Sequence, residues 1–211
     1  PSPRWRPDGR TIAFLAKRGD AEAVAQIFLM NAGGGEAWAL TSHASAVSDM
    51  QWTPDGQALF FKAPEPKSAD EKARDKLKDD VYAFDESFKQ DHLWRIGVAD
   101  KAARRITDGD FSVTDYELSR DGSLIAFQKG PSPLFGDNLR GEVWVMRADG
   151  SGARQLTTNG VPEGNASLSP DNTQLLFTSQ SNAAFEPYFH AKLFVVPAAG
   201  GPARLLAPGS V

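Results

Sequence analysis

One five-residue tract recurs four times along the chain, and it constrains the fold more than any single residue does. The copies lie at residues 5–9 (WRPDG), 52–56 (WTPDG), 118–122 (LSRDG) and 168–172 (LSPDN). A short apolar stretch follows each copy, at residues 11–14, 58–61, 124–127 and 174–177. Because turn and strand recur together, a whole supersecondary unit is repeated.

The tract has the chemistry of a tight turn between two strands. Pro7 fixes φ for the second turn position, Asp8 can accept a hydrogen bond from nearby backbone, and Gly9 tolerates the conformation needed to leave the turn. In the first repeat a second apolar stretch (26–31), a glycine turn (33–35) and a further short stretch (37–41) follow. The pattern predicts four antiparallel strands per repeat.

Four such sheets bury their faces most economically when they stack radially, so the sequence predicts an all-β fold, a β-propeller. A stacked or sandwich arrangement of the same strands is the alternative. We expect repeats at about 1–45, 46–111, 112–160 and 161–211, which together form one partial propeller domain over residues 1–211. The chain starts at a first strand and offers no strand to fasten a closed circle. We therefore expect an arc of a larger ring of about seven or eight blades.

The second repeat carries an insertion. The turn aspartates Asp8, Asp55, Asp121 and Asp171 are spaced by 47, 66 and 50 residues, against an ordinary period of about 45 to 50 residues for a four-stranded blade. The charged stretch 63–80 accounts for the excess. Within it, Ser68 and Glu71 match a capping box, which predicts a short exposed helix. Both a solvated excursion and a flap over a functional cavity fit this stretch.

Composition narrows the class of protein. Hydrophobic residues make up 41% of the 211 residues and the formal net charge is −4, so a buried core is expected and nucleic acid is not an expected partner. The sequence contains neither an apolar run of about 18 residues nor a signal-peptide pattern, so no membrane span is expected. The absence of cysteine fits a periplasmic or secreted address and a cytoplasmic one equally well. Because Pro1 already lies inside a repeat, we expect that an upstream segment has been removed.

Three tracts carry a resemblance to a known family: residues 79–86 (DDVYAFDE), 92–96 (HLWRI) and 104–111 (RRITDGDF). They resemble the N-terminal propeller of prolyl oligopeptidase family serine peptidases, in particular the acylaminoacyl-peptidase and dipeptidyl-peptidase-like bacterial branch. The resemblance implies a catalytic α/β-hydrolase domain of the same polypeptide, outside this chain, and an oligopeptide substrate that the propeller admits or excludes. The repeats alone also fit a TolB-like periplasmic propeller that acts as a protein-binding module.

No catalytic residue is expected in this chain. An α/β-hydrolase nucleophile needs a Gly-x-Ser-x-Gly elbow, and the sequence contains no such pentad. Gly150-Ser151-Gly152 is too short and falls in a turn between two expected strands. By itself the chain is therefore expected to be inactive in proteolysis.

The resemblance suggests where substrate contacts lie. In dipeptidyl-peptidase-like relatives, acidic propeller residues hold the free amino group of the peptide, since a carboxylate pairs well with an ammonium in a partly desolvated site. Asp85, Glu86 and Glu186 are the candidates, although ordinary solvated loop acids would look the same. The loop around Phe185, Tyr188 and Phe189 is unusually aromatic, so it could contact the hydrolase domain or substrate. The same rings could instead pack under their own sheet.

The remaining candidates favour structural roles. His43, His92 and His190 lie in different repeats without zinc-ligand spacing, and Asp108-Gly109-Asp110 lacks the pattern of a calcium loop, so neither metal nor cofactor is expected. Core packing at equivalent strand positions is predicted for four tryptophans: Trp5, Trp52, Trp94 and Trp144. The exposed sheet edges of a partial propeller predict self-association, so a homo-oligomer is possible.

Overall fold

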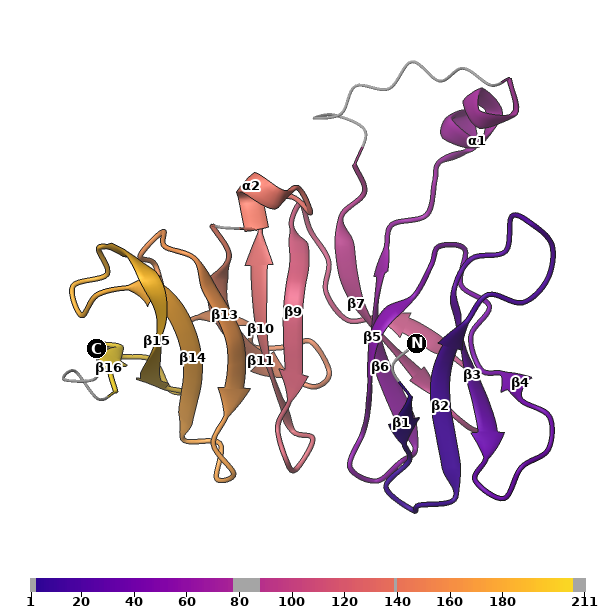
Figure 1. Ribbon diagram of the computed structural model, residues 1–211, viewed down its shortest axis with the longest axis horizontal. Coiled ribbons are helices and arrows are strands. Elements are labelled where there is room, and N and C mark those ends of the chain that lie inside the picture. The colour runs from indigo at the N-terminus through magenta and orange to yellow at the C-terminus, as the bar shows by residue number, and fades with distance from the viewer. Residues whose placement is uncertain (1–2, 78–87, 139, 207–211) are drawn as a thin grey trace. The chain divides into compact units, whose positions relative to one another are not determined.

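The computed structural model describes residues 3–77, 88–138 and 140–206, which form four four-stranded antiparallel sheets and two short helices (Figure 1). The prediction of an all-β chain with four strands per repeat is confirmed. The chain divides into two compact units, Pro1–Thr107 and Asp108–Val211. Two sheets belong to each unit.

Unit 1 contains sheets 1 and 2. Sheet 1 is built from β1 (Arg4–Trp5), β2 (Thr11–Ala16), β3 (Gln26–Asn31) and β4 (Trp38–Ala39), in chain order. Sheet 2 is built from β5 (Ser48–Trp52), β6 (Ala58–Pro64), β7 (Asp91–Gly97) and β8 (Ala103–Arg105), also in chain order. The helix α1 (Ala69–Lys76) follows β6.

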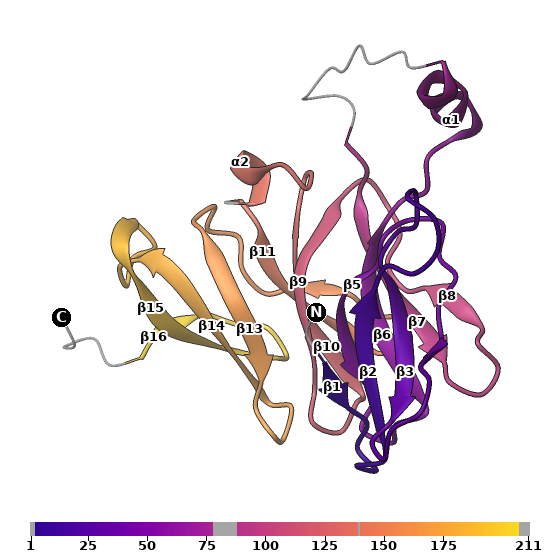
Figure 2. The same cartoon turned by 45° about the vertical axis from the view of Figure 1, so that its right-hand side comes forward.

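Unit 2 repeats the arrangement. Sheet 3 contains β9 (Ser112–Leu118), β10 (Leu124–Gly130), β11 (Glu142–Arg147) and β12 (Arg154–Gln155), with the short helix α2 (Phe135–Asn138) between β10 and β11. Sheet 4 contains β13 (Glu163–Leu168), β14 (Gln174–Ser181), β15 (Pro187–Pro197) and β16 (Arg204–Leu205). Figure 2 shows β13, β14 and β15 following one another across sheet 4.

The recurring tract forms the turn between the first and second strands of every sheet. Its aspartate accepts a hydrogen bond from the backbone N–H two residues later; for Asp8 and Arg10 the distance is 2.8 Å. The residue after the aspartate adopts a positive φ, which is 67° at Gly9 and 60° at Asn172. Glycine adopts this conformation without steric cost, and asparagine is among the residues that tolerate it best. The turn chemistry is therefore the same where Asn172 replaces glycine.

The turn also fixes the register. In each sheet the last residue of the first strand pairs with the second residue of the second strand; the pairs are Trp5 with Ile12, Trp52 with Leu59, Leu118 with Ile125, and Leu168 with Leu175. A slip of one residue would turn every side chain to the other face of a sheet. The shared register therefore places equivalent side chains on the equivalent face of each sheet.

Each unit has its own apolar core between its two sheets. In unit 1, Ala13, Ile27 and Leu29 of sheet 1 pack with Leu59 and Phe61 of sheet 2. In unit 2, Ala126, Val143 and Val145 of sheet 3 pack with residues of sheet 4, among them Leu175, Phe177 and Phe194. Burial of such side chains removes about 25 cal/mol of unfavourable hydration per Å² of apolar surface, so the contacts between sheets provide the main stabilisation of each unit.

The prediction for the four tryptophans was wrong in two respects. They occupy two different positions: Trp5 and Trp52 end first strands, whereas Trp94 and Trp144 lie on third strands opposite Phe61 and Phe127. Trp5 is also 61% exposed, because it lies on the two-residue strand β1. The repeat predicts where a residue lies in its strand, but the burial of its side chain depends on which other residues pack against it.

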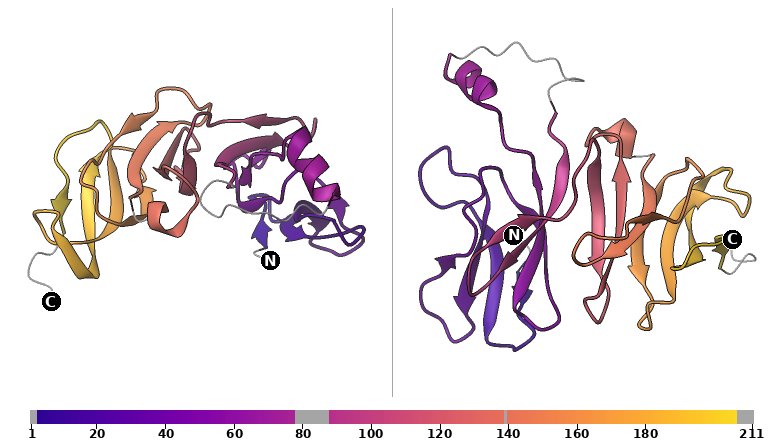
Figure 3. Two further views of the ribbon diagram at one scale, coloured as in Figure 1. Left: turned by 90° about the horizontal axis from the view of Figure 1, so that it is seen from above. Right: turned by 180° about the vertical axis from the view of Figure 1, so that it is seen from behind.

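The insertion begins as an extended segment after β6 and leads into α1, which projects beyond the strands of sheet 2 (Figures 1 and 3). The predicted capping box is confirmed: Ser68 N donates to Glu71 Oε2 (2.7 Å), and Glu71 N donates to Ser68 Oγ (3.2 Å). Lys89 pairs with the same carboxylate at 2.8 Å. These bonds lower the pKa of Glu71 to about 2. The helix ends at Lys76, and its role as a functional flap stays a prediction.

Candidate functional site

A cluster of polar side chains occupies one end of unit 2. Because the recurring turns join first to second strands, the opposite end of each sheet holds the starts of the first and third strands. Glu142 opens β11 and Glu163 opens β13 at that end, where the loop from β12 to β13 also passes. Two carboxylates from neighbouring sheets are thereby placed near each other.

Glu163 is held by three donors. Thr157 Oγ1 donates to its Oε2 at 2.6 Å, Asn159 Nδ2 donates to its Oε1 at 2.6 Å, and the backbone N–H of Val143 donates to Oε2 at 3.2 Å. The hydroxyl oxygen of Thr157 also accepts from Val143 N at 2.9 Å. The carboxyl group is therefore fixed in position by residues of the neighbouring sheet and of the loop that leads to β13.

The electrostatics of the pair bring the titration of Glu163 close to neutral pH. Burial, together with the nearby charge of Glu142, raises the pKa of Glu163 from its ordinary value of 4.5 to about 7 against the opposing effect of its hydrogen bonds. Glu142 Oε1 accepts from Gly160 N at 2.8 Å, while its buried Oε2 has no hydrogen-bond donor among the residues that the structure describes. Such a pair can hold or release one proton, or bind a cationic group that replaces the proton.

Sequence reasoning did not find Glu142 or Glu163. The signal present is a threonine that recurs two residues after the fourth strand: Thr41, Thr107 and Thr157 each accept a hydrogen bond from a third-strand N–H, at 2.8, 3.0 and 2.9 Å. The second partner of that hydroxyl differs between sheets. It is the ring Nδ1 of His92 for Thr107, at 3.1 Å, and Glu163 for Thr157. The repeat in the sequence therefore predicts the position of the threonine, but it does not predict that an acid such as Glu163 contacts it.

Glu186, one of the acids expected to contact substrate, lies in the turn between β14 and β15. Asn182 Nδ2 donates to Glu186 Oε2 at 2.7 Å, and Glu186 N donates to Asn182 Oδ1 at 3.0 Å. These bonds close the turn, and the side chain remains exposed. The other two acids, Asp85 and Glu86, lie outside the described residues.

The three aromatic candidates of this hairpin differ in environment. Phe185 stacks on the core residue Phe194 with ring centroids 4.9 Å apart, so it packs under its own sheet. Tyr188 is 43% exposed and Phe189 is 96% exposed. The ammonium of Lys192 lies 4.5 Å from the ring centroid of Tyr188. Tyr188 and Phe189 are therefore the rings available for contact, and their role as a contact surface stays a prediction.

The described residues contain neither a metal-binding cluster nor a membrane-spanning helix. Within residues 3–77, 88–138 and 140–206, no group of three or more histidine, aspartate or glutamate side chains is arranged to hold a metal ion. Of the helices that the structure describes, neither has the length and apolarity to cross a membrane.

Comparison with known proteins relates this geometry to a family. No family model matches the chain. The sequence is 31% identical over 161 residues to the uncharacterized peptidase YuxL of Bacillus subtilis (strain 168). The match covers 68% of this chain and 24% of YuxL, so the chain spans about a quarter of the length of this curated relative.

Solved structures with a similar fold include a puromycin hydrolase and TolB. A puromycin hydrolase mutant complexed with PGG superposes with a TM-score of 0.61 at 14% identity, covering 96% of this chain and 28% of that chain. TolB from Acinetobacter baumannii superposes with a TM-score of 0.59 at 18% identity, covering 100% of this chain and 44% of TolB. At these identities the likeness shows the fold alone.

The chain therefore has a β-propeller fold. Its resemblance to the N-terminal propeller of prolyl oligopeptidase family peptidases is confirmed by the peptidase relative. The narrower acylaminoacyl-peptidase and dipeptidyl-peptidase-like branch stays a prediction.

Proposed function

We propose that this chain is the propeller part of a prolyl oligopeptidase family serine peptidase, and that it selects oligopeptides for an α/β-hydrolase domain of the same polypeptide. The observation that carries the proposal is the 31% identity to the peptidase YuxL. The sequence contains no Gly-x-Ser-x-Gly elbow, so in this proposal bond cleavage belongs to residues outside the chain. The propeller contributes selection rather than catalysis.

Size selection predicts a specific dependence on substrate length. A propeller that restricts entry admits short or unfolded peptides and excludes folded proteins. The test uses the complete polypeptide that contains this chain and measures kcat/KM on peptides of increasing length with one cleavable bond. We expect kcat/KM to fall steeply beyond a limiting length. Equal rates on long peptides and on a folded protein with the same exposed bond would contradict gating.

The acids of the propeller supply a second element of selection. Asp85, Glu86 and Glu186 remain the candidates that the family resemblance suggests for holding the amino group of the substrate. Glu163 adds a desolvated carboxyl group with a pKa of about 7, and such a group gains most from a cationic partner because the partner replaces its proton. We therefore include Glu163, with Glu142 beside it, in the proposed amine-binding region.

The acids are tested with paired substrates. If Glu163 pairs with the free amine, Glu163→Gln raises KM for a peptide with a free N-terminus by about tenfold or more and leaves KM for its N-acetylated form unchanged. Glu36→Gln, at an exposed loop position, is the matched control. An equal effect on both substrates would remove Glu163 from amine recognition.

The alternative is a protein-binding propeller, and the likeness to TolB over the whole chain favours it. The two proposals separate on one measurement. A fluorophosphonate reagent labels the activated serine of a serine hydrolase covalently, so labelling of the native polypeptide supports the peptidase. If the native polypeptide is neither labelled nor active on peptides, the protein-binding propeller is the proposal that remains.

A further inference from the structure

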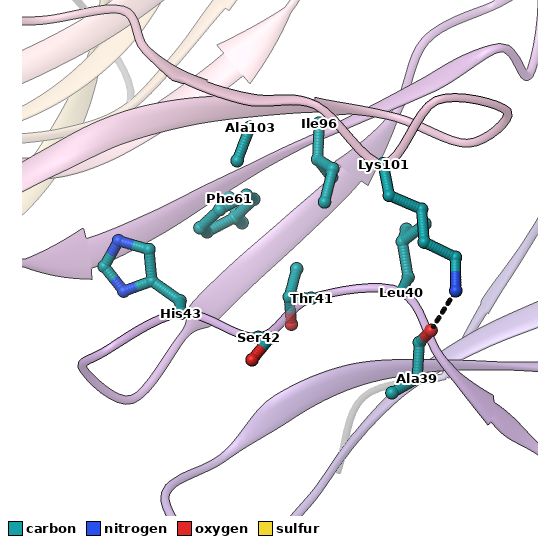
Figure 4. A pocket seen from close by; sticks show the side chains of 9 residues that line it. All are labelled: Ala39, Leu40, Thr41, Ser42, His43, Phe61, Ile96, Lys101 and Ala103. Atoms are coloured by element: carbon teal, nitrogen blue, oxygen red, sulfur yellow. Dashed lines mark hydrogen bonds between the residues drawn. The ribbon is translucent and has the colours of Figure 1, made fainter.

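A pocket of about 360 Å³ opens in unit 1 between the loop after β4 and the outer strands of sheet 2. It lies within the range of about 300 to 1,000 Å³ that is usual for small-molecule sites. Figure 4 shows His43 and Lys101 on opposite sides of it, with Thr41, Phe61 and Ile96 between them. The proposed peptidase function makes no use of this pocket, and the inference below does not rest on that function.

The base of the pocket is apolar. Leu40, Phe61 and Ile96 form its floor and belong to the buried core of unit 1, whereas the exposed Ala39 and Ala103 give it accessible apolar surface. The ring of His43 meets Phe61 edge to face with centroids 5.9 Å apart, and so closes one side. Backbone bonds hold His43 in place, since Gln26 Oε1 accepts from His43 N at 2.8 Å and Gln26 Nε2 donates to His43 O at 2.9 Å. An apolar group entering the pocket would meet preformed walls.

Lys101 provides the charge at the other side. Burial lowers the pKa of His43, and Ser45 N donates to its Nδ1 at 3.2 Å; both favour the neutral imidazole. Lys101 is therefore the charged residue among those that line the pocket. Its Nζ donates to the carbonyl of Ala39 at 3.1 Å. That bond uses one of the three N–H donors of the ammonium.

The backbone of Lys101 marks it as unusual. In sheets 1, 3 and 4 the third residue after the third strand is a glycine with positive φ (Gly34, Gly150 and Gly200), whereas in sheet 2 that place is Asp100 and the positive φ, 52°, falls on the next residue, Lys101. This conformation costs an L-residue free energy that glycine would not lose. Such outliers cluster at ligand sites, where the surrounding structure holds them. The adjacent Asp100 accepts from Ala102 N at 3.0 Å and so is engaged within its own turn.

We propose that this pocket binds a small carboxylate with an apolar side chain. The carboxylate pairs with the Lys101 ammonium at the mouth, and the side chain lies against the exposed Ala39 and Ala103, above the buried Leu40, Phe61 and Ile96. An N-acylated amino acid and the C-terminal residue of a short peptide share this chemistry. Recognition of the carboxylate charge therefore depends on Lys101 alone. Lys101 can be substituted without removing any part of the apolar base.

The test is a calorimetric titration of the intact protein with N-acetylleucine and with a tripeptide that ends in leucine. N-acetylleucinamide, which lacks the charge, and N-acetylglycine, which lacks the apolar side chain, are the matched probes. Lys101→Gly removes the charge and suits the turn, Lys101→Arg keeps the charge, and Ala103→Leu fills the pocket with Lys101 in place. Lys17→Gln is the control, because Lys17 is exposed and does not line the pocket. Circular dichroism establishes that each variant is folded.

We expect at least one of the two carboxylate probes to bind. Binding of N-acetylleucine identifies an N-acylated amino acid as a ligand, and binding of the tripeptide identifies a peptide C-terminus. Lys101→Gly and Ala103→Leu should weaken binding by about tenfold or more, as expected for loss of a charged hydrogen bond or of the cavity. Lys101→Arg and Lys17→Gln should retain binding. The proposal is overturned if neither carboxylate binds, if the amide binds as well as the acid, or if Lys101→Gly binds like the wild type.

Discussion

The side-chain amide of Asn172 donates a hydrogen bond of 2.9 Å to Oδ2 of Asp121, so it joins the turn before β14 to the turn before β10. The same amide reaches Ser123 Oγ at 3.2 Å. Hydrogen bonds from Ser123, Ser119 and Asn172 to its carboxylate hold the pKa of Asp121 well below its usual range. The substitution of asparagine for glycine in the fourth tract therefore links the two sheets of unit 2 at their turn ends.

This relationship predicts different costs for two substitutions. Asn172→Ala loses the hydrogen bonds and also places alanine at a φ of 60°, so we expect the free energy of unfolding to fall by about 1 to 2 kcal/mol. Asn172→Gly loses only the hydrogen bonds, and glycine suits the turn, so its cost should be smaller. Urea unfolding measures both. Equal destabilisation by the two variants would mean that φ at this position carries no cost.

Glu163 predicts a pH dependence of stability. Its pKa rises from 4.5 to about 7 on folding, so the folded state binds the proton more tightly than the unfolded state. The resulting stability is fully present below pH 4.5, is lost as the pH rises through about 7, and changes no further above it. At about 1.4 kcal/mol per pKa unit the loss amounts to about 3 to 4 kcal/mol.

Glu163→Gln should remove this component. Unfolding free energies at pH 5, 6, 7 and 8 should fall less steeply with pH in the variant than in the wild type, whereas Glu36→Gln should retain the wild-type slope. Parallel curves for wild type and Glu163→Gln would show that the carboxyl group titrates normally in the folded protein.

Val143 and Leu193 are equivalent third-strand residues of sheets 3 and 4, but Val143 is fully buried and Leu193 is 48% exposed. Val143→Glu buries a charge in the core of unit 2, and we expect it to cost more than about 3 kcal/mol or to prevent folding. Leu193→Glu should change stability by less than about 1 kcal/mol and lower self-association of the 211-residue chain. Sedimentation velocity and urea unfolding check the pair. Unchanged association would show that this face of sheet 4 does not mediate it.

Ser68 predicts a local effect. Ser68→Ala removes the hydroxyl that accepts from Glu71 N, at a cost to α1 of about 1 kcal/mol, while Ser68→Asp keeps a capping acceptor. Amide hydrogen exchange in α1 should therefore quicken in the alanine variant and stay close to wild type in the aspartate variant. Since α1 projects beyond sheet 2, the midpoint of global unfolding should not shift. A matching shift of that midpoint would mean that α1 contributes to the core.

The sequence predicted the repeated sheets well because their determinants are local. The turn depends on contacts of Asp8 and its equivalents with residues two positions away, and strand patterning depends on near neighbours. The capping box of Ser68 and Glu71 was found for the same reason. The candidate site was largely missed, because the environment of Glu163 comes from Val143 on β11 and Thr157 in the loop after β12, and its own segment carries no motif.

By itself, the sequence determined the four-stranded repeats, their turns, the place of the insertion and the family resemblance, because short-range backbone chemistry and periodic apolar residues encode them. Only the tertiary structure decided that Trp5 is exposed, that Glu163 is desolvated beside Glu142, and that Lys101 faces His43 across an apolar pocket. Burial, the pKa of an acid and the shape of a cavity all depend on which distant segments pack together. No local pattern in a single sequence specifies those contacts.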